Sequence, residues 1–279
     1  NFFEDVRPSF LVQNEMYGGI GFKLPVTNSS NTELDFRYFA LEDDYYQTDA
    51  FTNQDTSDFT RFSGYSLSWD YQYNTLNRKQ FSDEGSSFLF KVRFIDGEEN
   101  TFPGSNSILI DPVNRQHRWL NFETELQSYF LKNRFVHLGI HLKSVFSTQP
   151  LFANYTASLL SVPYFDVLPD MNTFFLPEYR SSQFFGSGLN VVFSLKKKID
   201  LRFDSYWYQP ILKLSKSQNG VFQTAKLFTE SNFLLSSSLI YHTIVGPIRM
   251  SLNFFPEQKD PFAFQISYGY VIFNDKAIR

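Results

Sequence analysis

Apolar and polar residues alternate with a period of two in eleven stretches that run from one end of the chain to the other. In residues 33–40, for example, Leu34, Phe36 and Tyr38 alternate with Asp35 and Arg37. This period places successive side chains on opposite faces of a β-strand, so the chain predicts a sheet with one apolar and one charged face. The eleven stretches are residues 10–26, 33–40, 65–74, 88–94, 120–127, 136–143, 185–195, 199–207, 233–241, 248–254 and 262–272.

The aromatic content indicates where the apolar face lies. The 279 residues include 34 Phe and 16 Tyr, and aromatic residues make up 19% of the chain. Each aromatic side chain buries about 150–250 Å², so a dozen strands of them would overfill the interior of a soluble barrel or sandwich. In contact with lipid they need no protein partner, and the charges then line the interior. The pattern therefore predicts an all-β fold: a transmembrane antiparallel β-barrel in the bacterial outer membrane, with lipid as its partner.

The connections between these strands support the same interpretation. Long and short connections mostly alternate, as expected when long loops point outward and short turns face the periplasm. The long connections are Glu42–Asp58, Gly97–Asn114, Gln149–Gln183 and Gln209–Asn232. About 11–12 strands fit the chain, whereas bacterial single-chain barrels have even numbers of strands. With eleven strands and a periplasmic C-terminus, we expect an odd number of further strands before Asn1, so that residues 1–279 form part of a larger barrel.

Charges of both signs occupy the polar face of the predicted strands. A mixture of this kind suits an interior closed by salt-linked side chains or by a plug better than a strongly selective pore. His137 and His141 share this face but lie about 13 Å apart along a strand, too far to hold one metal ion. The predicted lumen-lining residues are Glu33, Asp35, Arg37, Lys91, Arg93, Glu123, Glu125, His137, His141 and Lys143.

Motifs for catalysis are missing from the sequence. It contains no Gly-x-Ser-x-Gly elbow, no P-loop, no His/Cys cluster at metal-ligand spacing and no cysteine. The net charge of −4 argues against a nucleic-acid partner. A Ser–His site on the barrel wall is an alternative, but His141 and Ser144 fall on opposite faces of their strand. We therefore predict no catalytic residue, metal or cofactor within this chain, and leave open whether the protein is an enzyme.

Several short motifs resemble one family of barrels. Residues 73–81, Tyr-Asn-Thr-Leu-Asn-Arg-Lys-Gln-Phe, precede Glu-Gly-Ser at 84–86, and residues 246–251 read Gly-Pro-Ile-Arg-Met-Ser. The ending at 264–273, Phe-Gln-Ile-Ser-Tyr-Gly-Tyr-Val-Ile-Phe, is an aromatic final strand. Together with residues 149–157, these motifs are similar to the POTRA-barrel superfamily of outer-membrane assembly factors. Within it they resemble the C-terminal barrel of Bacteroidetes-type patatin-like phospholipases.

This resemblance implies that catalysis and membrane anchoring belong to different domains of a longer protein. Such proteins carry a catalytic Ser–Asp dyad in an upstream patatin domain, then a POTRA module and a barrel of about sixteen strands. The chain would then be a non-catalytic anchoring or translocation domain. The alternatives are a porin-like channel, an outer-membrane protein assembly or secretion barrel, and a barrel-wall phospholipase. Other outer-membrane proteins or a second copy of the chain would be further partners.

The resemblance also implies two structural details. In the superfamily the sixth outer loop folds into the lumen, where a Val-Arg-Gly-aromatic motif holds it. The loop at 149–183 occupies the matching place, and Tyr179-Arg180-Ser181-Ser182 is its nearest equivalent to the motif. We expect Arg180 to turn inward toward Asp200 or Asp204; the alternative is a solvated arginine on the loop. The terminal strand that would close the barrel carries Phe264, Ile266, Tyr268, Tyr270 and Phe273.

Overall fold

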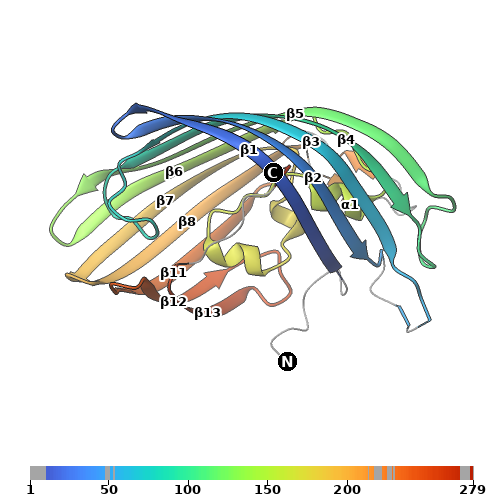
Figure 1. Ribbon diagram of the computed structural model, residues 1–279. Helices are drawn as coiled ribbons and strands as arrows, with labels where there is room; N and C mark the ends of the chain where they lie inside the picture. Colours follow the sequence, from blue (N-terminus) through green and yellow to red (C-terminus); the bar gives the residue numbers. More distant parts are fainter. Residues whose placement is uncertain are drawn as a thin grey trace.

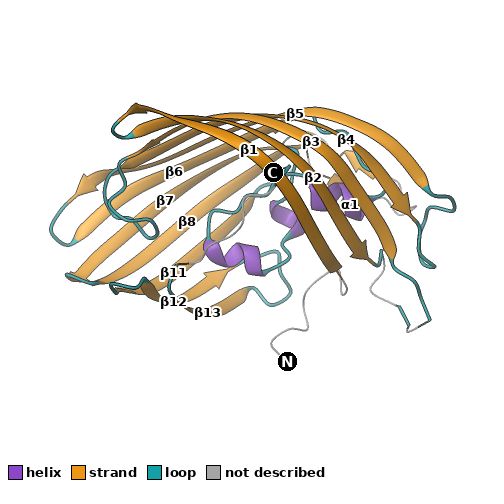
Figure 2. Cartoon of the chain, viewed as in Figure 1, coloured by secondary structure: helices purple, strands orange, loops and turns teal. Residues whose placement is uncertain are grey.

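The residues that the structure describes form one antiparallel sheet of eleven strands, a separate pair of short strands, one short α-helix and two short 3₁₀-helices (Figures 1 and 2). The computed structural model describes residues 11–47, 51–52, 54–212, 214–216, 222–224, 228, 230–270 and 277–278. Each strand of the sheet pairs with the next one along the chain. The strands are β1 (Leu11–Thr27), β2 (Ser30–Tyr45), β3 (Asp58–Asn74), β4 (Ser86–Phe102), β5 (Val113–Lys132), β6 (Val136–Ser147), β7 (Gln183–Lys196), β8 (Ile199–Leu212), β11 (Asn232–His242), β12 (Pro247–Phe254) and β13 (Phe262–Tyr268). The separate pair β9 (Leu214–Lys216) and β10 (Phe222–Thr224) lies between β8 and β11 in the chain.

All eleven predicted strands are confirmed, but several extend beyond the alternating pattern. β5 has 20 residues, and the predicted long loop at 97–114 shrinks to residues 103–112. The loop prediction is wrong because Glu98 pairs with Gln116 and Thr101 with Val113, so the ladder continues. Polar residues occupy both faces there, which removes the alternation while leaving the backbone hydrogen bonds intact.

The sheet is curved but open. β1 pairs with β2 alone and β13 with β12 alone, so the described strands do not close into a barrel. Figure 1 shows β1 in blue and β13 in red at two separate edges. Of the residues expected in the closing strand, Phe264, Ile266 and Tyr268 lie in this edge strand, Tyr270 follows it, and Phe273 lies outside the described residues. β13 ends at Tyr268, before Gly269, whose φ of 90° is a left-handed conformation that favours glycine. Residues 271–272 of the predicted strand lie outside the described residues.

The two faces of the sheet have opposite chemistry. The convex face exposes large apolar side chains on strands across the sheet: Phe36 is 49% exposed, Trp69 45% and Ile266 65%. The concave face buries polar and charged side chains, among them Arg93, Arg249 and Asn253. This is the reverse of a water-soluble sheet. Among the described residues, no helix is both long and apolar enough to span a membrane.

The connection between β6 and β7, residues 148–182, lies in the hollow of the sheet (Figure 2). We call it the inner segment. It contains α1 (Tyr155–Ser161), η1 (Pro169–Thr173) and η2 (Pro177–Tyr179). The side chain of Asn154 caps α1 by accepting a hydrogen bond from the backbone N–H of Ala157. The inner segment thus has local structure of its own.

Two apolar clusters attach the inner segment to the concave face. In one, Phe165 and Tyr179 pack with Tyr208 of β8. In the other, Phe152 packs against Phe62 of β3 and Trp119 of β5. The buried apolar core of the molecule therefore lies between the sheet and its own connecting loop.

Candidate functional site: the filled concave face

Two segments enter the hollow of the sheet from opposite ends. The connections at one end are residues 28–29, 75–85, 133–135, 197–198 and 243–246, and we call it the turn end. The inner segment starts from the other end, which we call the loop end. Residues 75–85, the longest connection at the turn end, also make contacts on the concave face. Polar side chains of the sheet hold both segments.

Asp170 of η1 is the most heavily bonded residue of the inner segment. Its carboxylate accepts two hydrogen bonds from Nη1 of Arg249, at 2.7 and 2.8 Å. It also accepts one from the hydroxyl of Ser251 at 2.9 Å and one from Nδ2 of Asn253 at 2.6 Å. These partners are alternate residues of β12, so all three point from the same face of that strand. The carboxylate and the guanidinium are both buried, where charge-assisted hydrogen bonds are strong.

Arg249 also contacts the segment that enters from the turn end. Its guanidinium carbon lies 5.1 Å from the centre of the Phe81 ring. Phe81 has a φ of 55°, a conformation that non-glycine residues adopt rarely. Nη1 of Arg202 donates to the carbonyl of Ser82 at 2.9 Å, which holds the same segment to β8. Arg249 therefore joins the inner segment and residues 75–85 to the sheet.

A second ion cluster joins β5, β6 and the inner segment. Nζ of Lys143 lies 2.8 Å from Asp166 of the inner segment, 3.2 Å from Glu123 and 3.6 Å from Glu125. Glu125 also lies 2.9 Å from Nε2 of His141. Four of the predicted lumen-lining residues thus come together here, on neighbouring strands, around one buried lysine.

The other predicted lumen-lining residues also lie on the concave face but in separate groups. Glu33 pairs with Lys23 of β1 at 3.0 Å, and Arg37 forms an ion pair with Asp35. Lys91 lies opposite Glu123 in the register of β4 and β5. Arg93 of β4 is buried on this face, with an exposed fraction of 2%.

The expected pairing of Arg180 with Asp200 or Asp204 is wrong. Arg180 turns inward, but its guanidinium carbon lies 4.6 Å from the centre of the Tyr164 ring. Asp200 instead contacts His242 at 2.8 Å and Arg78 at 2.9 Å, and Asp204 contacts Arg202 at 2.8 Å. The register explains the error. Gln183 lies opposite Leu212 at the loop end of β8, whereas Asp200 is twelve residues away, about 40 Å along the strand.

The inner segment also buries phenol groups. Burial raises the pKa of Tyr164 and of Tyr179 above the usual value of 10.0. The Tyr164 hydroxyl donates to the carbonyl of Met171 and the Tyr179 hydroxyl to that of Phe233, each at 2.9 Å. Both hydroxyls therefore bond to the backbone as neutral donors.

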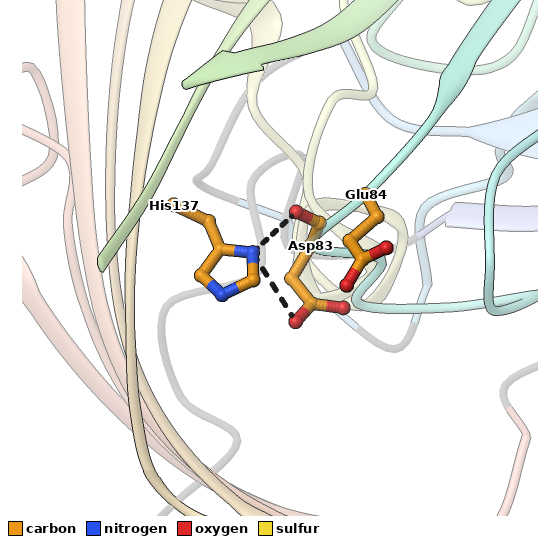
Figure 3. Close-up of side chains that lie close together, drawn as sticks. All are labelled: Asp83, Glu84 and His137. Atoms are coloured by element: carbon orange, nitrogen blue, oxygen red, sulfur yellow. Dashed lines mark hydrogen bonds and ion pairs between the residues drawn. The ribbon is translucent and has the colours of Figure 1, made fainter. Parts of the chain in front are cut away.

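Among the described residues, Asp83, Glu84 and His137 form a group that could hold a metal ion, with ligand atoms within 4.8 Å of one another (Figure 3). Each member already has a partner. Nδ1 of His137 lies 2.9 Å from the carbonyl oxygen of Asp83, whose carboxylate lies 2.9 Å from Arg78. Glu84 lies 2.6 Å from Lys132. Two cations thus neutralise the two carboxylates, and the group is built to hold residues 75–85 in place.

A buried Glu–His pair lies at the loop end. Nε2 of His117 is 2.7 Å from Glu99, and Phe152 stacks on the imidazole with 4.8 Å between the ring centres. Glu99 also accepts from the backbone N–H of Ala153 at 2.8 Å and from the hydroxyl of Thr101 at 2.8 Å. Because the hydroxyl bonds the carboxylate and not the imidazole, this geometry does not activate a nucleophile. The pair fastens the start of the inner segment to β4 and β5.

Sequence reasoning predicted Lys143 as a lumen-lining residue but missed Asp166, Asp170 and Arg249, which hold the inner segment with it. A signal for them exists in residues 150–177, where Asp166 and Asp170 are the two acidic residues in an otherwise apolar and neutral stretch. Both pair with cations of the sheet, Lys143 and Arg249. Isolated charges in an apolar loop thus mark its attachment points.

Comparison with known proteins adds no assignment. No protein-family model matches the chain, and no curated protein is significantly similar to it in sequence.

Proposed function

We propose that this chain is the membrane-embedded, non-catalytic anchoring domain of an outer-membrane β-barrel protein. The observation that carries the proposal is the inverted sheet, with apolar side chains exposed on the convex face and charges buried on the concave face. Leaving a large apolar side chain in water costs about 1.5–3 kcal/mol relative to burying it. A face with a dozen such side chains is therefore suited to lipid. The exposed set includes Leu34, Phe36, Tyr38, Tyr65, Leu67, Trp69, Leu120, Phe122, Phe203, Leu239, Met250 and Leu252.

The filled interior favours an anchor over an open channel. The inner segment is held by two ion clusters, around Asp170 and Lys143, and by two apolar clusters. A channel or a secretion barrel would have to release these contacts before solutes could pass. The patatin-like identity rests on the motif resemblance alone. A Gly-x-Ser-x-Gly motif encoded upstream of Asn1 would support it.

The proposal also requires that both edges of the sheet are paired within the membrane. Unpaired backbone N–H and C=O groups do not face the hydrocarbon core of a bilayer. β1 and β13 must therefore pair with each other, with further strands, or with strands of another chain.

Tryptophan fluorescence tests the orientation of the sheet, because the chain has three tryptophans. Trp69 is 45% exposed on the convex face, whereas Trp119 is buried on the concave face. Variants that keep one tryptophan, with the other two replaced by Phe, are refolded into phosphatidylcholine vesicles. Phospholipids brominated on the acyl chain should quench Trp69 strongly and Trp119 weakly. If aqueous iodide quenches Trp69 and the brominated lipid does not, the proposal is wrong.

A further inference from the structure

Five exposed cations cluster on two neighbouring turns at the turn end. These turns connect β5 to β6 and β7 to β8. The backbone N–H of Ser194 donates to the carbonyl of Phe135 at 3.0 Å, which places the two turns side by side. We call the five cations the basic rim patch; they are Lys132, Arg134, Lys196, Lys197 and Lys198.

Most of this positive charge is not neutralised within the chain. Lys132 forms an ion pair with Glu84, and the Arg134 guanidinium lies over the ring of Phe135 at 5.2 Å. In the described part of the chain, no ion pair involves the three lysines at 196–198. The patch therefore has a surplus of positive charge, although the whole chain carries −4.

Exposed apolar side chains border the patch. Phe135 is 58% exposed and Leu195 is 56% exposed, on the same two turns. The backbone N–H of His242 donates to the carbonyl of Lys198 at 2.8 Å, which brings in the next turn, 243–246. At its tip Ile244 and Val245 are 96% and 70% exposed. Cations next to apolar side chains of this kind match the boundary between lipid head groups and acyl chains.

The opposite end of the sheet has different charges. Exposed carboxylates at the loop end include Glu98, Asp111, Glu257 and Asp260, together with the exposed cations Arg61, Arg115 and Lys259. Among the described residues, exposed cations at the loop end are thus accompanied by exposed carboxylates, whereas the three lysines at 196–198 are not. This asymmetry supplies a matched control for any experiment on the patch.

We infer that the basic rim patch binds the phosphate groups of anionic phospholipids in the leaflet at the turn end. The inference rests on the proposed membrane location. Each lysine or arginine near the surface raises the affinity for an anionic membrane by a factor of about five, the equivalent of about 1 kcal/mol. The adjoining apolar side chains select a lipid over a soluble phosphate, because they need an acyl chain to cover them.

A local tryptophan reports on the lipid beside the patch. Phe135→Trp is made in a chain with Trp69→Phe and Trp207→Phe, so that the buried Trp119 is the remaining native tryptophan. The full chain is refolded into vesicles that contain either brominated phosphatidylglycerol or brominated phosphatidylcholine. The ratio of the two quenching constants gives the selectivity at the patch. The native Trp207, kept alone with Trp119, reports selectivity elsewhere on the convex face.

We expect phosphatidylglycerol to be favoured about fivefold or more at residue 135 and about equally with phosphatidylcholine at Trp207. Lys196→Gln, Lys197→Gln and Lys198→Gln together should bring the ratio at residue 135 close to one. The corresponding triple Arg variant should keep it, and so should Arg61→Gln, Arg115→Gln and Lys259→Gln combined. High salt should lower the selectivity of the native patch.

The outcomes separate this inference from the proposed function. Equal quenching by both lipids at residue 135, in the native patch and in the Gln variant alike, would overturn the inference and leave the membrane location standing. Quenching by neither lipid at either reporter would overturn the membrane location itself.

Discussion

Asp170 of the inner segment accepts two hydrogen bonds from Nη1 of Arg249 on β12, although 79 residues separate the two in sequence. The contact joins the loop between β6 and β7 to β12, the third strand along the sheet from β7. The Phe81 ring, from the segment that enters at the other end, lies against the same guanidinium. One buried arginine thus fastens both segments that fill the concave face.

Removing the carboxylate should destabilise the fold strongly. Asp170→Ala leaves the guanidinium of Arg249 buried without its counter-charge, so we expect the free energy of unfolding to fall by about 3–5 kcal/mol. Urea unfolding of the protein refolded in detergent micelles or vesicles measures this loss. Asp260→Ala, at an exposed position of the loop end, is the matched control and should change stability by less than about 0.5 kcal/mol. Equal midpoints for the two variants would contradict the anchoring role of Asp170.

Removing the ion clusters that hold the inner segment should change the ionic conductance of the domain reconstituted in a bilayer. We expect the native protein to show little or no steady conductance in a planar bilayer, because the inner segment fills the hollow. Asp170→Ala combined with Lys143→Ala removes both ion clusters of the inner segment and should produce frequent openings. A native protein with a large, stable conductance would favour the channel alternative instead.

Alkaline pH should weaken the attachment of the inner segment. Burial raises the pKa of Tyr164 and Tyr179 above 10.0, the value expected in the unfolded chain. The stability that the neutral phenols contribute is fully present below about pH 10 and is lost as the pH rises toward the folded-state values. The urea concentration at the unfolding midpoint should therefore be lower at about pH 11 than at about pH 9. The Tyr164→Phe and Tyr179→Phe double variant should fall less steeply than Tyr268→Phe, whose phenol is exposed. Identical pH profiles would count against this linkage.

The group at Asp83, Glu84 and His137 should be indifferent to metal in the native protein. Arg78 and Lys132 neutralise its carboxylates, so neither chelator nor zinc should move the melting temperature. Replacing both cations with Gln frees two carboxylates beside an imidazole, a ligand set that zinc accepts. Zinc should then raise the melting temperature of that double variant, and adding His137→Gln should abolish the rise. A zinc-dependent shift in the native protein would show that the two cations do not block the site.

The wrong prediction that Arg180 pairs with Asp200 or Asp204 shows the limit of a comparison based on a short motif. The loop was expected to fold inward and to be held by a charge, and the structure has a charged contact between a loop residue and the sheet. The polarity is the opposite of the expectation, because the loop supplies the acid, Asp170, and the strand supplies the arginine, Arg249. Arg180 lies too far from Asp200 along β8 to reach it. A motif compared by sequence alone gives no register, and register decides which charges meet.

The strands and their two faces could be predicted from local sequence patterns. Alternation is a local property, since successive side chains of a strand point to opposite sides whatever the rest of the chain does. Leu34 and Asp35 could therefore be assigned to opposite faces without knowledge of any neighbour. The three-dimensional arrangement was needed to show where the ladders end, that the described sheet is open and which buried charges pair. Those outcomes depend on strand register and on how the inner segment packs, and contacts between residues as distant as Asp170 and Arg249 leave no periodic trace in the sequence.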